Sequence, residues 1–200
     1  MNSTPAGPRI AAVILAAGSS RRMGANKLLA TIGGKPLVRV AVDAAIGSKA
    51  SPVIVVTGGY ASEVMAALSG LSVTEAFNPD YASGLASSLS AGLARAPADA
   101  DGAVVLLADM PGVESSLIDQ LIDAFAPDRI VVPTFHGQRG NPIVWSRQFF
   151  PQLRDLSGDV GGRFVIEANG PAVIEVLAGA AVATDVDTPE ALQAVGGKLC

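Results

Sequence analysis

The chain has 200 residues, half of them hydrophobic, with a formal net charge of −4 at pH 7 and a single cysteine, Cys200. That length suits one domain with a sizeable core, and we assign it to residues 9–195 after a lead-in, residues 1–8, expected to be disordered. The composition excludes an internal disulfide, a cysteine metal cluster and a basic surface for nucleic acid, and no apolar run is long enough to cross a bilayer. We therefore expect a soluble, cytoplasmic protein without nucleic-acid or membrane partners.

Apolar runs and helical patterns alternate along the first two thirds of the chain. The continuous apolar run 10–16 predicts a strand covered on both faces, and residues 36–46, after the turn Gly33-Gly34, have the spacing of a helix. The same reasoning predicts further strands at 52–57, 71–76, 102–107 and 130–133, and further helices at 61–68, 83–95 and 115–125, the last capped by Ser115.

Beyond residue 133 the pattern loosens. We expect a polar loop at 136–142, a short strand, helical stretches around Phe149 and Phe164, and a final strand leading to Asp185. The alternation predicts an α/β fold, a Rossmann-like three-layer αβα sandwich with a mostly parallel, mixed central sheet. Within it, residues 9–133 form the expected nucleotide-binding part and residues 134–195 an acceptor-binding part.

The loop that follows the first strand has the composition of a phosphate site. Residues 18–24 combine two glycines, two serines and two arginines, so backbone N–H groups and guanidiniums could both contact phosphate oxygens. An ordinary turn with solvated basic residues is the alternative. Neither G-x-x-x-x-G-K-[ST] nor G-x-G-x-x-G occurs, which disfavours a P-loop NTPase and a dinucleotide-binding dehydrogenase.

A family resemblance rests on this loop. The run Leu15-Ala16-Ala17-Gly18-x-Ser20-x-Arg22-Met23-Gly24-x-x-Lys27 resembles the signature of the nucleotide-diphospho-sugar-transferase-like nucleotidyltransferases. Later segments narrow the resemblance to the MobA-like NTP transferases, in particular the molybdenum cofactor cytidylyltransferases. These segments are Asn78-Pro79 with Gly84 and Ser88, Asp109-Met110-Pro111, Arg139-Gly140-Asn141-Pro142, Ser157-Gly158-Asp159-x-Gly161-x-Arg163 and Asp185-Val186-Asp187-Thr188-Pro189-Glu190.

Two aspartates are candidate ligands for Mg²⁺. Asp109 follows the apolar strand 102–107, and Asp187 follows the final predicted strand. Magnesium needs only one or two protein carboxylates when substrate phosphates supply further oxygens. The alternatives are structural: Asp109 as a turn or cap residue, and Asp187 or Thr188 as the cap of a helix that begins at Pro189. The single histidine, His136, is expected to be a solvated loop residue.

The resemblance implies that an acceptor phosphate attacks the α-phosphorus of CTP and releases pyrophosphate, with Mg²⁺ as cofactor and molybdopterin as the acceptor. It implies catalytic roles for Lys27, Arg22 and Asp109. The nucleotide-binding residues that it implies are Leu15, Ala16, Ala17, Gly18, Ser20, Arg22, Lys27, Asn78, Gly84, Ser88 and Asp109. The implied acceptor-binding residues are Arg139, Asn141, Asp159 and Arg163.

The choice of CTP rests on Ala17, because related guanylyltransferases commonly have glycine there. Relatives also often carry His in place of Asn141 and Lys-Gly-Ala in place of 160–162, so this chain lacks one positive charge on the acceptor side. Other possibilities are a different phosphorylated acceptor such as methylerythritol phosphate, a guanylyltransferase, a non-catalytic carrier of the finished cofactor and an NAD-dependent oxidoreductase. A transient contact with a molybdoenzyme or its maturation factor is a further expectation.

Overall fold

A computed structural model describes residues 7–18 and 26–199 of the chain. In these residues the main sheet consists of β1 (Ile10–Leu15), β4 (Val53–Thr57), β5 (Thr74–Phe77), β6 (Gly102–Leu107), β7 (Ile130–Phe135), β8 (Gln138–Arg139), β9 (Ile143–Ser146) and β10 (Val173–Leu177). The strand order is β10-β7-β9-β6-β1-β4-β5, with β8 paired to β7. Among these strands only β8 and β9 run antiparallel to their neighbours, so the sheet is mixed but mostly parallel, as predicted.

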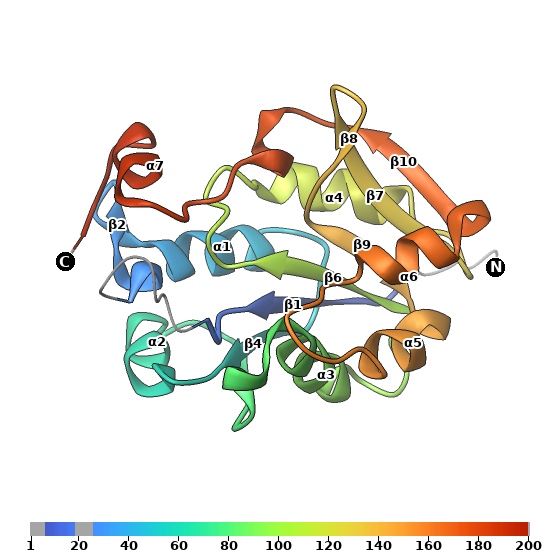
Figure 1. Cartoon of the computed structure of the whole chain (residues 1–200), viewed down its shortest axis with the longest axis horizontal. Coiled ribbons are helices and arrows are strands. Elements are labelled where there is room, and N and C mark those ends of the chain that lie inside the picture. The colour runs from blue at the N-terminus through green and yellow to red at the C-terminus, as the bar shows by residue number, and fades with distance from the viewer. Residues whose placement is uncertain (1–6, 19–25, 200) are drawn as a thin grey trace, which may run out of the picture.

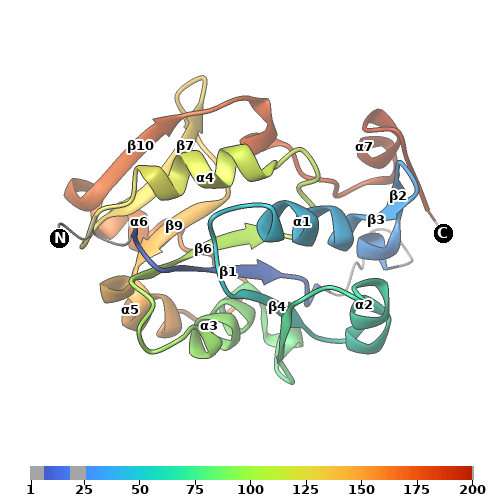
Figure 2. The ribbon, with the colours of Figure 1, turned by 180° about the vertical axis from the view of Figure 1, so that it is seen from behind.

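Helices cover both faces of the sheet (Figure 1). They are α1 (Leu37–Ile46), α2 (Ala61–Ala67), α3 (Leu85–Arg95), α4 (Ser115–Asp123), α5 (Phe150–Arg154) and α6 (Arg163–Ala168), whereas α7 (Pro189–Ala194) lies apart from the main sheet, beside β2. Helices α1 and α4 lie on one face, and α3 and α5 lie on the other, an arrangement that the view from behind repeats (Figure 2).

The two faces have separate apolar cores because alternate side chains of a strand point in opposite directions. Ala12 and Ile14 of β1 belong to the cluster that includes α1, α2 and α4, whereas Ala11 and Val13 belong to the cluster with α3, α5 and α6. All four side chains are fully buried. The continuous apolar run of β1 therefore reflects a central strand covered on both sides, and the predicted three-layer αβα fold is confirmed.

Several predicted boundaries are wrong. The third strand begins at Thr74 instead of residue 71, because Gly70 has a φ of 81° and Leu71 belongs to the turn after α2. Helix α3 begins at Leu85, after Gly84 with a φ of 118°. The residue at the N-cap of α4 is Glu114, not Ser115.

The predicted final strand is also wrong in position. β10 ends at Leu177, and a 3-10 turn, Ala180–Ala183, separates it from Asp185. Within the described part of the chain, no helix is both long enough and apolar enough to cross a membrane.

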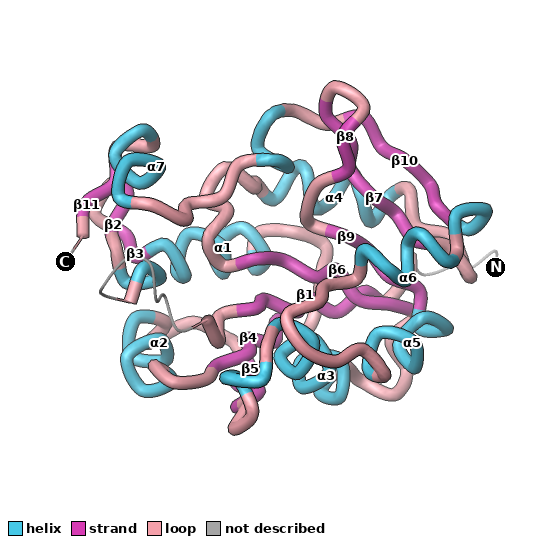
Figure 3. Tube along the Cα trace, in the orientation of Figure 1, coloured by secondary structure: helices cyan, strands magenta, loops and turns pink. Residues whose placement is uncertain are grey.

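A second, small sheet joins the C-terminal segment to the region after the first loop (Figure 3). Strands β2 (Thr31–Ile32), β3 (Lys35–Pro36) and β11 (Gly197–Lys198) are arranged in the order β11-β2-β3, and both pairings are antiparallel. Beneath them, Ala30, Leu37, Val186 and Leu192 form an apolar cluster of their own. These two-residue strands are too short to show a periodic pattern, so the sequence did not predict them.

The connection of strands places two predicted loops side by side. Strand β4 pairs with one edge of β1, and β6 pairs with the other edge. Because β1 and β6 are parallel, their carboxyl ends lie next to each other. Leu15 is in register with Leu107, and the Ala108 N–H donates to the Leu15 carbonyl at 3.2 Å. This is the switch in strand order at which open α/β sheets bind ligands.

Candidate functional site

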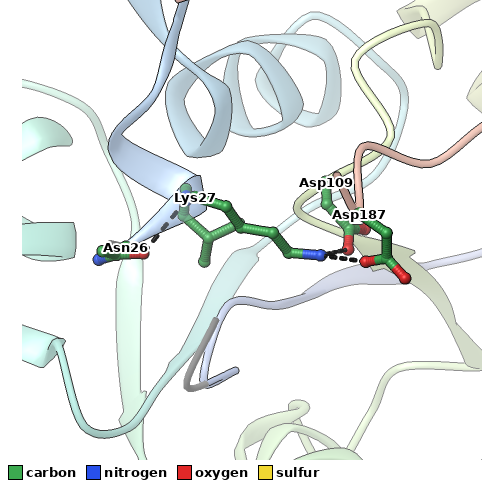
Figure 4. A network of polar contacts seen from close by, with 5 residues as sticks. Asn26, Lys27, Asp109 and Asp187 are labelled. Carbon is green, nitrogen blue, oxygen red and sulfur yellow. Dashed lines mark hydrogen bonds and ion pairs between the residues drawn. The ribbon is translucent and has the colours of Figure 1, made fainter. Parts of the chain in front are cut away.

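Lys27 begins the first turn of the second described range, residues 26–199. This turn is a 3-10 helix, η1 (Lys27–Leu29), and the Asn26 carboxamide oxygen accepts the Leu28 N–H at 3.1 Å. Leu28 is buried in the apolar cluster that also contains residues of α1 and α2. The cap and the buried leucine fix the backbone from which Lys27 extends toward the carboxyl end of the sheet (Figure 4).

The Lys27 ammonium lies between two carboxylates. Its Nζ donates to Oδ2 of Asp109 and to Oδ1 of Asp187, each at 2.6 Å (Figure 4). Side-chain exposure is 14% for Lys27, 18% for Asp109 and 37% for Asp187. Burial alone would lower the pKa of Lys27, but the attraction of the carboxylates, Asp109 above all, more than offsets it and raises that pKa above its ordinary value. Lys27 is therefore a cation at neutral pH.

Asp109 is held by the end of β6 and by the C-terminal segment. Its backbone carbonyl accepts the Val186 N–H at 2.9 Å, which brings residue 187 next to residue 109. Its second carboxylate oxygen, Oδ1, is buried and has no hydrogen-bond partner among the described residues. Such an oxygen is costly to leave unpaired, and it is a ready ligand for a cation.

The helix after Asp187 is capped by its neighbour. Thr188 is the N-cap residue of α7, and its hydroxyl accepts the Ala191 N–H at 3.2 Å. Of the two capping residues considered, the structure thus identifies Thr188, while the Asp187 carboxylate faces Lys27. The two predicted metal ligands, Asp109 and Asp187, therefore both contact Lys27, although they come from segments far apart in the sequence.

The predicted nucleotide-binding residues of the first loop are only partly described. Leu15, Ala16 and Ala17 follow one another at the end of β1, and both alanines are buried. Gly18 is exposed and ends the first described range. Ser20 and Arg22 lie outside the described residues.

Asn78 and Ser88 are in direct contact. The buried Asn78 side chain donates to the hydroxyls of Ser87 and Ser88, at 2.9 and 3.1 Å, and its carbonyl oxygen accepts the Asp80 N–H at 3.0 Å. Asn78 therefore joins the turn after β5 to helix α3 through contacts within the chain.

Gly84 connects the predicted nucleotide and acceptor segments. A Cβ at this position would lie 2.3 Å from the Gly158 carbonyl carbon and oxygen, so no larger residue fits without moving the backbone. The Ala86 N–H also donates to the Gly158 carbonyl at 3.2 Å. The loop that contains Asp159 is thus packed directly on the start of α3.

A cavity of about 850 Å³ opens beside these strand ends. Its apolar wall includes Leu15, Leu107 and Trp145, which connects it to the carboxyl ends of β1 and β6. Three of the four predicted acceptor-binding residues line it: Arg139, Asn141 and Arg163. Asp159 does not, and it lies exposed on the loop against Gly84.

Each arginine of the cavity is paired with a glutamate that the sequence analysis missed. Arg139 contacts Glu175 at 2.8 Å, and Arg163 contacts Glu167 at 2.7 Å. Both glutamates also line the cavity. The spacing of four residues between Arg163 and Glu167 on a predicted helix was a usable signal. Nothing local in the sequence pointed to Glu175, because it comes from a strand 36 residues away from Arg139.

The chain matches one family model and several known proteins along most of its length. Residues 12–173 match the family model described as a MobA-like NTP transferase domain. The purine catabolism protein PucB of Bacillus subtilis (strain 168) is 31% identical over 92% of this chain and 94% of its own length. The nicotine blue oxidoreductase of Paenarthrobacter nicotinovorans is 28% identical with the same two coverages.

A solved structure shares both the fold and the sequence pattern. Rv0371c of Mycobacterium tuberculosis H37Rv superposes with a TM-score of 0.85 at 29% identity, covering 95% of this chain and 98% of that one. A structure of Rv0371C from the same organism in complex with manganese superposes with a TM-score of 0.79 at 28% identity over the same coverages.

Proposed function

Because the chain belongs to the MobA-like NTP transferase family and is a nucleotidyltransferase, we propose that it transfers CMP from CTP to the terminal phosphate of the molybdenum-molybdopterin cofactor. Pyrophosphate is the second product. The observation that carries the proposal is the convergence of Lys27, Asp109 and Asp187 at the switch in strand order, beside a cavity whose polar rim contains two arginines.

The donor atoms fit a divalent cation. Asp109 and Asp187 present carboxylate oxygens to the same point, and one buried oxygen of Asp109 has no hydrogen-bond partner in the part of the chain that the structure describes. The described residues contain no group of three or more Asp, Glu, His or Cys that could hold a metal, so phosphate oxygens and water would complete the coordination. This is the pattern of Mg²⁺, which, when bound, would neutralise charge on the phosphates. The manganese complex of the related protein supports a divalent metal here.

The chain's own cations supply the remaining charge neutralisation. A terminal phosphate is already anionic near neutral pH, so the nucleophile needs no general base. Lys27, and with it Arg22, would balance charge on the α-phosphate and on the departing pyrophosphate, and binding would align the attacking oxygen. Ala17, buried at the end of β1, supports CTP over GTP because relatives that use GTP commonly have glycine there.

The cavity supports an acceptor with a bulky body and an anionic end. Its apolar wall, which includes Trp145, suits a ring system, while Arg139 and Arg163 can pair with phosphate in bidentate fashion. Another phosphorylated acceptor would use the same chemistry, so methylerythritol phosphate remains an alternative.

One relative is named as an oxidoreductase, and this name is the observation that favours a second candidate function. The missing G-x-G-x-x-G argues against an NAD site of the usual kind. Calorimetry with NAD and with CTP, each with and without Mg²⁺, distinguishes the two functions. It also tests the non-catalytic carrier, which would bind the finished cofactor but need no free CTP.

The experiment that tests the proposal is a pyrophosphate-release assay with each of the four NTPs. The acceptors are molybdopterin, its molybdenum-loaded form and methylerythritol phosphate. We expect release with CTP and the molybdopterin acceptors only. Release with GTP instead of CTP would indicate a guanylyltransferase. No release with any pair of substrates would contradict the proposed function.

A further inference from the structure

We propose that Lys27 occupies the metal's place while no nucleotide is bound, and that metal binding requires the ammonium to leave the two carboxylates. The triphosphate of the incoming nucleotide is the ligand that draws Lys27 away. Metal and nucleotide would then bind cooperatively, because each favours the same exchange of cations. This inference rests on the metal site proposed above and adds to it the control of that site.

The contacts of Lys27 show that the ammonium and a metal ion exclude each other. Nζ lies 2.6 Å from one oxygen of each carboxylate. Mg²⁺ would bind such oxygens at about 2.0 to 2.1 Å, so an ion held by both of them would fall within contact distance of Nζ. Both groups are positively charged, so repulsion adds to the overlap. One of the two has to leave.

The contacts of Asp109 show that Lys27 fills the place incompletely. One ammonium contacts one oxygen of each carboxylate in a partly buried position. Among the described residues, Oδ1 of Asp109 is buried without a hydrogen-bond partner. A divalent cation would give that oxygen a ligand, which the Lys27 ammonium does not.

The position of Lys27 in the chain lets the ammonium move without a change of fold. The residue is the first of η1, directly after the loop predicted to wrap the triphosphate, and its four-carbon side chain is flexible. A phosphate oxygen is an alternative acceptor for the ammonium. Once Lys27 contacts phosphate, Asp109 and Asp187 are open to the metal. By linkage, a bound metal must raise nucleotide affinity by the factor by which nucleotide raises metal affinity.

The exchange makes an unusual prediction: loss of a residue placed in the catalytic machinery should improve binding of the metal. We compare Mn²⁺ affinity, measured from the paramagnetic signal of free Mn²⁺, for wild type, Lys27→Met and Lys27→Gln without nucleotide. Both variants should bind Mn²⁺ at least tenfold more tightly than wild type. Lys49→Met is the matched control, because Lys49 also pairs with an aspartate, Asp123, but on an exposed surface. The Mn²⁺ affinity of Lys49→Met should equal that of wild type.

A second measurement uses the wild-type chain, so it holds even if the variants fold poorly. Acylation of lysine amines is followed by mass spectrometry with and without saturating Mn²⁺. Release from the carboxylates should make Lys27 react several-fold faster when Mn²⁺ is present, whereas Lys49 should react at the same rate.

Two results would overturn the exchange: nucleotide-free Mn²⁺ affinity that is unchanged or weaker in both Lys27 variants, or acylation of Lys27 that Mn²⁺ leaves unchanged or slows. The proposed function fails separately. It fails if no NTP supports pyrophosphate release, and its metal site fails if Asp109→Asn and Asp187→Asn leave Mn²⁺ affinity unchanged in the presence of CTP.

Discussion

Two groups of ion pairs belong to the proposed site, one at the carboxyl ends of β1 and β6 and one at the cavity, and they differ in burial much more than in length. On the proposed nucleotide side, Lys27 contacts Asp109 and Asp187 at 2.6 Å, and the Lys27 side chain is 14% exposed. On the proposed acceptor side, the Arg163 contact with Glu167 is 2.7 Å, but the arginine side chain is 85% exposed.

Burial decides what each pair can do. Removing one partner of a buried pair leaves an uncompensated charge, whereas an exposed pair contributes little and exchanges partners readily. The proposed nucleotide side therefore keeps its three side chains together until a ligand replaces one of them, whereas the proposed acceptor side can release its glutamates at little cost. The predictions below test this difference, beginning with the largest expected effect.

Lys27→Ala should lower turnover about 100- to 1,000-fold, because it removes a cation that stabilises charge on the phosphates in the transition state. CTP binding should weaken far less. Steady-state kinetics with CTP measure both quantities. An unchanged kcat would exclude Lys27 from the mechanism, and a change confined to KM would make it a binding residue only.

Asp109→Asn should lower metal-dependent pyrophosphate release about 100-fold while the fold survives, because asparagine keeps the size of the side chain but loses the charge that holds Mg²⁺. Activity is measured against Mg²⁺ concentration, with the melting temperature as a check on folding. Asp123→Asn, in the exposed pair with Lys49, is the control and should behave as wild type. A mutant with wild-type turnover and Mg²⁺ dependence would show that Asp109 is a turn residue.

Leu192→Ala should lower the free energy of unfolding by about 2 kcal/mol, at the low end for a buried leucine because its cluster is small. Leu192 is 1% exposed and packs with Val186, so Mn²⁺ affinity should also fall as Asp187 loses its support. Urea unfolding and Mn²⁺ titration measure the two effects. Leu199→Ala, in the same segment but 44% exposed, should change neither. Equal effects from both would argue against the small cluster as the support of Asp187.

Arg163→Ala should raise the KM for the phosphorylated acceptor about tenfold, because a guanidinium that can pair with phosphate is lost. The KM for CTP should stay nearly the same. The two substrates are varied separately in steady-state assays, with the exposed Arg154→Ala as the control. If CTP binding collapses while the acceptor KM is constant, segment 157–163 belongs to the nucleotide side.

Glu167→Gln should have the smallest effect and the opposite sign. It frees Arg163 from an exposed pair of the i, i+4 type, which is worth about 0.3 to 0.5 kcal/mol, so the acceptor KM should fall about twofold. A higher acceptor KM in this variant would mean that Glu167 itself contacts the acceptor.

The sequence predicted those features that depend on local pattern. The apolar run of β1 and the alternation of strands and helices were sufficient for the three-layer sheet, because side-chain periodicity follows directly from the geometry of each element. The position of Asp109 after β6 was equally predictable. Turns and short strands were less so: residues 71–73 continue the apolar pattern but lie in a turn, and the two-residue strands β2, β3 and β11 leave no periodic signal.

Contacts between distant segments were decided only by the tertiary structure. Lys27 and Asp187 are 160 residues apart, and they meet because Val186 and Leu192 bury themselves beside Ala30 and Leu37 while β11 pairs with β2. The sequence named both residues as candidates, but it could not show that the ammonium lies on the carboxylates, because no local pattern encodes which surfaces pack together. Glu175 remained unseen for the same reason: its pairing with Arg139 depends on the placement of β10 beside β7.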